Sequence, residues 1–281
     1  MNTYYGSSEI GSDNNTGTSV SAPLATLQDA ANLVKPGDTV EVMNGTYTGP
    51  GYGNVLNITT SGTASAPITF EAAPGATPII DSSGSWNGIN IQASYIVVQG
   101  FTVVGDAASY TLQTALAGYS SGNASLDGHG IAVTPGGSAS LPNHITIANN
   151  TVYNEPGGGI YTEGADYVQI LNNVVYNNAH WSAFGNSGIS VSTSANLDTN
   201  PGAHIVISGN LVFNNAQLVP TDGSNAITDG EGIILDTNPG YTGEILVQNN
   251  TAYGNGGPGI ESFLTANAAI TGNTVYGNNT Q

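Results

Sequence analysis

The second half of the sequence repeats one eleven-residue motif. Its first copy reads Ile145-Thr-Ile-Ala-Asn-Asn150-Thr-Val-Tyr-Asn-Glu155, and further copies begin at Val168, Ile205, Ile245 and Ala268. A degenerate earlier copy begins at Ile96 and carries Phe101 where the others carry Asn. A short sequence motif that recurs along a chain indicates a stacked, solenoidal architecture.

The motif predicts the geometry of one turn of this solenoid, here called a rung. Apolar residues at its first and third positions indicate a short strand that faces a core. The recurring Asn is predicted to occupy a left-handed bend and to hydrogen-bond with its equivalents in neighbouring rungs. This Asn column consists of Asn150, Asn173, Asn210, Asn250 and Asn273.

A Gly-Ile pair recurs between the copies and adds a second strand to each rung. The pairs begin at Gly130, Gly159, Gly188, Gly232 and Gly259. The 23 residues from Ile145 to Val168 are too few for a strand and a crossover helix in every repeat. We therefore predict an all-β, parallel β-helix with rungs about 4.8 Å apart.

One segment near the N-terminus is predicted to be the only helix. Thr26 is a suitable N-cap for residues 26–35, where Leu27, Ala30 and Val34 form an apolar stripe, and Pro36-Gly37 ends it. We predict a single domain, 1–281, with a strand and cap helix in 1–36 and rungs in 37–281. Because the sequence stops within a motif copy, we expect a longer protein or a cover over that end.

The charge balance excludes several classes of partner. The chain has one Lys, no Arg, nineteen acidic residues and a net charge of −18. Nucleic-acid binding requires cationic side chains, so it is excluded, and an anionic membrane surface is disfavoured. The absence of Cys removes disulfides and thiolate metal sites, and no apolar run is long enough to insert into a membrane. We expect a monomer that attracts calcium and needs no organic cofactor.

Several N-terminal segments resemble a known group of proteins. Gly-Ser-Asp-x-x-x-Gly-Thr (11–18), Ala-Thr-Leu-Gln-Asp-Ala (25–30), Lys-Pro-Gly-Asp-Thr-Val (35–40), Asn-Gly-Thr-Tyr (44–47) and Ala-Pro-Ile-Thr-Phe-Glu-Ala (66–72) are similar to the opening of secreted right-handed parallel β-helix proteins. These form the pectate-lyase-like group of pectate, alginate and chondroitin lyases and mannuronan epimerases. The resemblance implies a right-handed solenoid, a polysaccharide partner and a secreted or cell-surface location. Many lyases of the group use Arg or Lys beside the sugar carboxylate, whereas this chain has only Lys35, at the end of the cap helix.

Long insertions before the Gly-Ile strands are the predicted site of chemistry. They span 106–128, 179–187 and 216–230, and loops on a rigid scaffold often carry function. Two of them end alike, in Asp127-Gly-His129 and Asp229-Gly-Glu231, and the third contains His180-Trp181. We predict that His180, Trp181, Asp229 and Glu231 reach one sugar, with His129 roughly 14 Å from Glu231 at rung spacing.

Strand alternation indicates a second group of candidates on the Gly-Ile strands. Tyr161, Glu163 and Asp236 are predicted to face outward, with Glu163 and Asp236 in one column about 10 Å apart. We assign catalysis to His180, Glu231, Asp229 and His129, and substrate binding to Trp181, Tyr161, Glu163 and Asp127. Asp229, Glu231 and Asp236 are the candidate metal ligands. Asp127 and Asp229 also fit ordinary Asp-Gly turns, and His144, His204 and the Tyr153 column fit structural roles.

Three functions remain open on this sequence. The first is β-elimination from an acidic polysaccharide, in which calcium neutralises the sugar carboxylate and His180 or His129 takes the C5 proton. The second is glycoside hydrolysis by paired carboxylates, which needs no positive charge. The third is a non-catalytic carbohydrate-binding or adhesive module.

Overall fold

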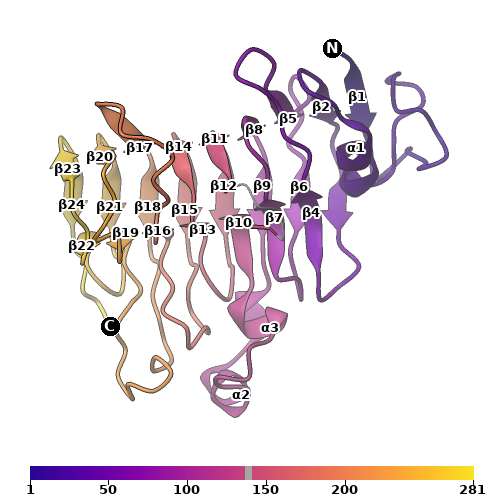
Figure 1. Cartoon of the computed structure of the whole chain (residues 1–281). Coiled ribbons are helices and arrows are strands. Elements are labelled where there is room, and N and C mark those ends of the chain that lie inside the picture. Colours follow the sequence, from indigo (N-terminus) through magenta and orange to yellow (C-terminus); the bar gives the residue numbers. More distant parts are fainter. Residues whose placement is uncertain (137–140) are drawn as a thin grey trace.

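The computed structural model describes residues 1–136 and 141–281, which form one parallel β-helix (Figure 1). Within the described residues, the strands make three sheets, numbered here in the order in which each rung crosses them. Sheet 1 contains β1 (Thr3–Gly6), β2 (Thr39–Val42), β5 (Ile68–Ala72), β8 (Ile96–Gln99), β11 (Asn143–Ala148), β14 (Asp166–Leu171), β17 (Ala203–Ser208), β20 (Glu244–Gln248) and β23 (Ala268–Thr271). Sheet 2 contains β3 (Thr46–Thr48), β6 (Ile79–Asp81), β9 (Thr102–Val104), β12 (Thr151–Tyr153), β15 (Val174–Tyr176), β18 (Leu211–Phe213), β21 (Thr251–Tyr253) and β24 (Thr274–Tyr276). Sheet 3 contains β4 (Asn54–Ile58), β7 (Asn87–Ile91), β10 (His129–Val133), β13 (Ile160–Glu163), β16 (Ile189–Ser192), β19 (Ile233–Asp236) and β22 (Ile260–Phe263).

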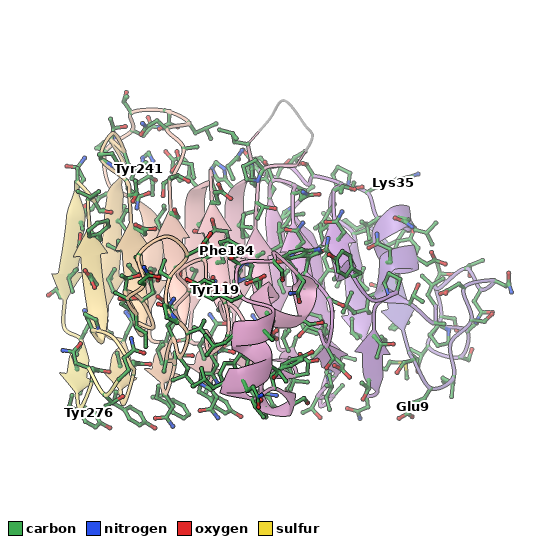
Figure 2. The ribbon with its side chains drawn as sticks, turned by 90° about the horizontal axis from the view of Figure 1, so that it is seen from below. Glu9, Lys35, Tyr119, Phe184, Tyr241 and Tyr276 are labelled. Carbon is green, nitrogen blue, oxygen red and sulfur yellow. The ribbon has the colours of Figure 1, made fainter. Side chains whose placement is uncertain are left out.

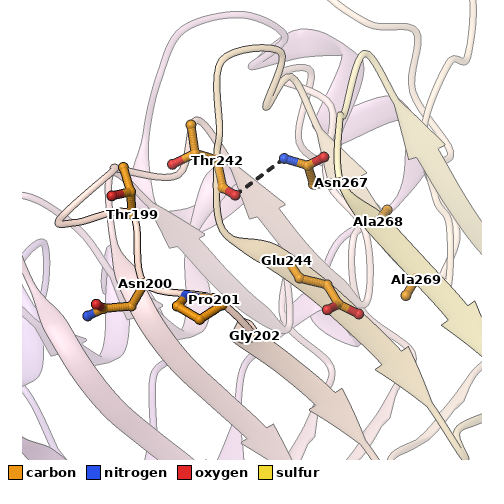
Figure 3. Close-up of a pocket in the computed structure, with 9 residues that line it drawn as sticks. All are labelled: Thr199, Asn200, Pro201, Gly202, Thr242, Glu244, Asn267, Ala268 and Ala269. Atoms are coloured by element: carbon orange, nitrogen blue, oxygen red, sulfur yellow. Dashed lines mark hydrogen bonds between the residues drawn. The ribbon is translucent and has the colours of Figure 1, made fainter.

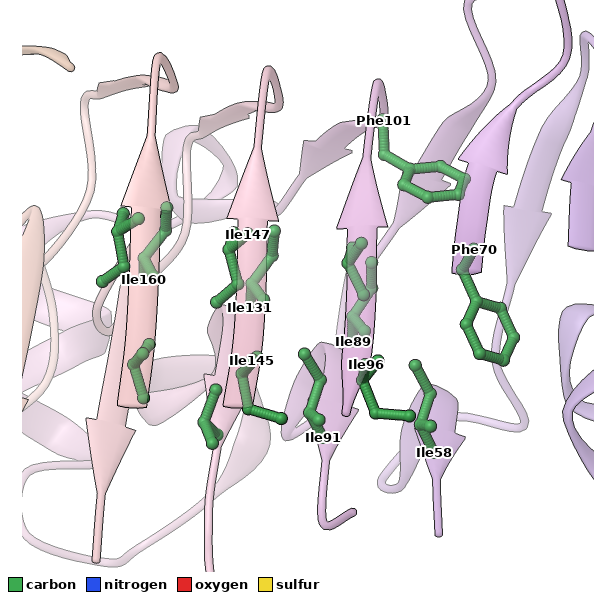
Figure 4. Close-up of a cluster of buried hydrophobic side chains, with 14 of the residues drawn as sticks. Ile58, Phe70, Ile89, Ile91, Ile96, Phe101, Ile131, Ile145, Ile147 and Ile160 are labelled. Carbon is green, nitrogen blue, oxygen red and sulfur yellow. The ribbon is translucent and has the colours of Figure 1, made fainter. Parts of the chain in front are cut away.

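The core is a stack of aliphatic columns, because the register places equivalent motif positions over one another. Ile145 pairs with Ile96 on one side and with Val168 on the other, and all three are fully buried. Figure 4 shows these columns as isoleucine side chains that follow one another from rung to rung. Each fully buried aliphatic side chain contributes about 1.5–3 kcal/mol, so the motif itself supplies the core energy. The predicted parallel β-helix is confirmed.

The Asn column forms a buried hydrogen-bonded ladder between sheets 1 and 2, as predicted. Asn210 Oδ1 accepts from the main-chain N of Asn173 at 2.8 Å and from its Nδ2 at 3.0 Å. The predicted left-handed bend, however, lies one residue earlier: φ is 54° at Asn172 and 70° at Gly209. The preceding residue takes the bend because the ladder Asn must keep its side chain inside the solenoid to reach the next rung.

A second ladder, absent from the sequence-based predictions, lies between sheets 2 and 3. Its members are Asn178, Asn215, Asn255 and Asn278, and Glu155 occupies the equivalent place in the rung before Asn178. A stacked aromatic column outside sheet 2 has the structural role expected for it, with Tyr153 and Tyr176 ring centres 4.9 Å apart. Side-chain ladders therefore line two of the three turns of each rung in this part of the chain.

The helices differ in part from the prediction. The cap helix α1 (Leu27–Leu33) is present, with the Thr26 hydroxyl accepting from Asp29 N at 3.2 Å. The prediction of a single helix is wrong, because the 106–128 insertion contains the short helices η1 (Ala107–Ser109), α2 (Leu112–Ala117) and α3 (Ala124–Asp127). Polar N-cap residues such as Thr111 begin these helices. Each helix is too short for a periodic pattern of apolar residues to be recognised in the sequence. No helix among the described residues is long and apolar enough to cross a membrane.

At the C-terminal rung, residues that face the core elsewhere in the motif are exposed. Ile270 of β23 and Val275 of β24 stand in the columns of Val247 and Ala252, which are fully buried one rung earlier.

Candidate active site

The three insertions lie at one edge of sheet 3 and enclose a groove. Each insertion connects a sheet 2 strand to the start of a sheet 3 strand: β10, β16 or β19 (Figure 1). Two adjoining cavities, of about 340 and 410 Å³, share Phe184, Gly185 and Asp236. We call them together the sheet 3 groove. It is lined by Trp86, Asp127, His129, Tyr161, Glu163, Ser182, Phe184, Gly185, Asn186, Ser192, Thr221, Thr228, Asp229, Glu231, Ile234, Asp236, Glu261 and Phe263.

The strand register confirms the predicted outward column. Glu163 pairs with Ser192, and Ser192 pairs with Asp236, so the two carboxylates stand two rungs apart on sheet 3. All three residues line the groove, as does Tyr161 on β13. Alternation along a strand fixes this column, because Ile160 and Thr162 must point into the core.

His129 lies in the groove but is not arranged to take a proton. Its ring stacks on Tyr161 with centres 5.1 Å apart, and its Nδ1 accepts from the main-chain N of Gly158 at 2.9 Å. Burial lowers the pKa of His129 to about 4, so the ring is neutral near neutral pH and carries its proton on Nε2. The nitrogen that could accept a proton from a substrate is therefore already hydrogen-bonded to Gly158, which argues against the predicted role of His129 as a base.

Glu231 is the most deeply buried carboxyl among the residues that line the groove. It is 1% exposed, and its Oε2 accepts from the Ser187 hydroxyl at 2.5 Å. Burial raises the pKa of Glu231 to about 7, the Ser187 hydrogen bond opposes this, and the nearby charges of Asp229 and Glu261 add to it. Asp229 lines the same cavity, and burial raises its pKa as well.

His180 and Trp181 are not part of the groove, so the predicted four-residue cluster is wrong. Trp181 is 9% exposed, its Nε1 donates to Ala107 O at 2.7 Å, and its ring packs among Ala107, Ala115, Leu126 and Val219. It fastens the 179–187 loop to the 106–128 insertion and has no face free for a sugar. His180 lines neither cavity, and burial lowers its pKa.

Asp127 combines a structural role with a place on the groove wall. Its carboxylate accepts from Asn123 N at 2.8 Å, which closes the short helix α3, and burial raises its pKa. The helix explains why this acid is held, so its proposed contact with a sugar remains a prediction.

The exposed aromatic side chains of the groove were not predicted from the sequence. Phe184 is 52% exposed and borders both cavities, and Phe263 on β22 is 48% exposed. Figure 2, seen from below, places Phe184 near the middle of the solenoid's length. Phe263 follows Asp236 in the outward column, so strand alternation contained the signal that could have identified it.

The acids of the groove do not form a ready-made metal site. Among the residues that the structure describes, no three His, Asp or Glu side chains converge closely enough to hold a metal ion. The predicted ligands Asp229, Glu231 and Asp236 line one cavity, yet Glu231 is turned to Ser187. This donor set does not fit calcium without a rearrangement.

A further cavity of about 460 Å³ lies over sheet 1 and contains no pair of titratable side chains (Figure 3). Glu244 is its one titratable side chain, among residues such as Asn200, Thr242 and Asn267. The neighbouring loop is held by His204, whose Nδ1 contacts Asp166 Oδ1 at 3.1 Å and whose Nε2 contacts Asn200 O at 2.9 Å. The predicted structural role of His204 is thereby accounted for.

Comparison with known proteins agrees with this architecture. The sequence model of the Pel9A-like, right-handed β-helix region matches residues 4–281. Pectate lyase PEL9 of Emericella nidulans is 42% identical over 71 residues, which is 25% of this chain and 16% of that relative. Among solved structures, pectate lyase Pel9A has a TM-score of 0.62 at 18% identity, covering 99% of this chain and 79% of that one.

Two other solved structures share the fold. A rhamnogalacturonan lyase has a TM-score of 0.57 at 18% identity, with 91% of this chain and 69% of that one covered. A GH136 lacto-N-biosidase from Eubacterium ramulus has a TM-score of 0.63 at 16% identity, with 97% and 55% covered. At these identities the structures show a common fold. The match over nearly the whole sequence shows more, and the chain belongs to the family of Pel9A-like right-handed β-helix proteins.

Proposed function

We propose that this chain cleaves a polysaccharide in the sheet 3 groove, with Glu231 transferring the proton. The observation that carries the proposal is a buried carboxyl, held by Ser187, in the wall of an open groove. The groove is lined from β10 to β22, which is five successive strands and roughly 19 Å at rung spacing, or a few sugar units. Secretion and a monomeric state belong to the same proposal.

β-Elimination from a uronic-acid polymer is the favoured reaction. The family, and the local identity to a protein named as a pectate lyase, support it. Glu231 as carboxylate takes the C5 proton, the C5–H electrons form the C4=C5 double bond, and the C4–O bond breaks. The departing oxygen then takes a proton from solvent. The pKa of about 7 suits a general base near neutral pH.

Hydrolysis is the second candidate, because the groove contains only acidic charges. In that reaction protonated Glu231 would donate to the leaving oxygen, and Asp236 or Glu163 would act as the partner carboxylate. The two reactions require opposite protonation states of Glu231, so the pH dependence of the rate separates them.

The test is a panel of polysaccharides digested with and without a chelator. Ultraviolet absorbance of unsaturated products reports elimination, and new reducing ends without that absorbance report hydrolysis. Glu231→Gln should lose on the order of 10²–10⁴-fold in rate, the usual worth of positioned proton transfer. Glu9→Gln, an exposed carboxyl outside the groove, is the matched control and should keep the parent rate.

Two outcomes would refute the proposal. If the Glu231→Gln variant cleaves the polysaccharide as fast as the unsubstituted chain, Glu231 does not transfer the proton. Binding of a glycan without cleavage of any would identify the non-catalytic module instead. Loss of activity with the chelator would show that calcium assists despite the dispersed carboxylates.

A further inference from the structure

The charges of the groove constrain what it can hold. Six of its lining residues are acids: Asp127, Glu163, Asp229, Glu231, Asp236 and Glu261. The chain has one Lys or Arg in total, and this residue, Lys35, lies near the N-terminal end of the solenoid, away from Phe184 in the groove (Figure 2). No cationic side chain of this chain can therefore neutralise an anionic sugar in the groove.

These acids are concentrated in a small volume. Asp229, Glu231, Asp236 and Glu261 line one of the two cavities, and Asp236 also lines the other cavity together with Asp127 and Glu163. Burial, followed by the charge of Glu163, raises the pKa of Tyr161. The sugar carboxylates of an acidic polymer would lie in the same negative field, and low-dielectric walls strengthen such repulsion.

The groove has no preformed binding site for a metal ion that could offset the repulsion between its acids and an anionic sugar. No three acidic or His side chains converge in the described parts of the groove, as stated above. Besides its acids, the groove offers aromatic surfaces to a ligand. Phe184 and Phe263 are half exposed, and Trp86 and Tyr161 line the same groove. Aromatic faces bind the C–H faces of sugars and small apolar substituents.

We propose that the sheet 3 groove takes a uronate polymer whose carboxyl groups are masked as neutral esters. The inference rests on the proposed elimination and specifies its substrate. An ester carbonyl withdraws electrons from C5 and stabilises the charge that develops when Glu231 removes the C5 proton. The double bond forms between C4 and C5, the C4–O bond breaks, and the ester is unchanged. Neither a metal ion nor an Arg is then needed to neutralise the substrate.

Binding to the Glu231→Gln variant tests the inference separately from cleavage. The probes are polygalacturonate fragments of equal length, fully methyl-esterified or fully de-esterified, titrated by calorimetry at low salt with chelator or with calcium chloride. We expect the ester to bind at least tenfold more tightly under both conditions. Equal affinities, tighter binding of the de-esterified fragment with or without calcium, or no binding of the ester would overturn the inference.

Charge variants connect that preference to the groove. Glu163→Gln combined with Asp236→Asn should reduce the preference for the ester, because it removes two charges from the outward column. Glu244→Gln, in the cavity over sheet 1, is the matched control and should leave the ratio of affinities unchanged. An unaltered ratio in the double variant would also overturn the inference. Cleavage by the parent chain is measured separately. If only the de-esterified polymer is cleaved, the proposed function is supported and the inferred preference for an esterified substrate is refuted.

Discussion

Glu155 stands at the head of the second ladder, where each of the rungs that follow has Asn. Its main-chain N donates to Asn178 Oδ1 at 2.9 Å, as a ladder residue should, but its side chain is a carboxyl that is 1% exposed. The Ser82 hydroxyl, 2.8 Å away, is its hydrogen-bond partner. Burial raises the pKa of Glu155 well above its ordinary value, and Asp106 and Asp81 raise it further. The folded protein therefore holds this proton more tightly than the unfolded chain does.

A pH-dependent stability follows from that carboxyl. Stability is fully present below the unfolded pKa of Glu and is lost as the pH rises toward the higher folded pKa, because the folded state must then bury a charge. Glu155→Gln should therefore weaken the fall in the denaturation midpoint that occurs as the pH rises above the ordinary pKa of a Glu side chain. Glu9→Gln should retain the full fall. Identical pH profiles for the parent and Glu155→Gln would show that this carboxyl is not kept neutral.

The raised pKa of Glu231 predicts how the rate of cleavage depends on pH. If it acts as a base in elimination, kcat/KM should rise through about pH 7 and then level, since the carboxylate is the active form. Ser187→Ala removes the hydrogen bond that favours the charged form, so it should move this limb to higher pH. A rate that falls through the same range would assign Glu231 the acid role of hydrolysis.

Each residue of the Asn ladder makes several buried hydrogen bonds to the neighbouring rungs. Asn210 accepts from Asn173 through Oδ1, and its Nδ2 donates to Ile170 O and Asn250 Oδ1, each at 2.9 Å. Every one of these groups is buried, so loss of a member leaves donors and acceptors without partners on both sides. The exposed residue one place earlier carries the backbone bend instead, as Gly209 does with a φ of 70°.

Substitutions at the two positions should therefore differ. Asn210→Leu should lower the free energy of unfolding by on the order of 1–3 kcal/mol, measured by denaturant titration. Asn249→Gly is the control: φ is 55° at Asn249, a value that Gly adopts without strain, so stability should change little. Equal effects from both changes would contradict separate roles for ladder and bend.

The whole molecule carries a net charge of −18, spread over a surface with a single Lys. Mutual repulsion of this size opposes the compact state and is screened by salt. Raising sodium chloride from about 0.01 M to about 0.15 M shortens the Debye length from about 30 Å to about 8 Å. The thermal midpoint should rise over this range by more than it does with sucrose at the same osmolarity, because sucrose stabilises through exclusion from the surface and does not screen charge. Equal responses to the two solutes would argue against charge repulsion.

The sequence by itself determined the solenoid, the register and the outward column of sheet 3. Stacked rungs place equivalent residues over one another, so a repeated motif encodes its own contacts. Glu163 and Asp236 could be placed in one column because Ile160 and Ile233 fix which face of each strand is buried. The family resemblance was readable for the same reason, since its matching residues belong to the repeated scaffold and its cap.

Tertiary structure alone decided which insertion residues face the groove. Insertions have no period, so nothing local distinguishes Trp181, buried against the 106–128 insertion, from Phe184, which is exposed three residues later. The raised pKa of Glu231 and the neutral state of His129 depend on burial by neighbouring loops and on Ser187 and Gly158, which meet them only in the folded solenoid. A repeat fixes contacts between rungs, whereas the chemistry of this groove depends on contacts between loops that the repeat does not encode.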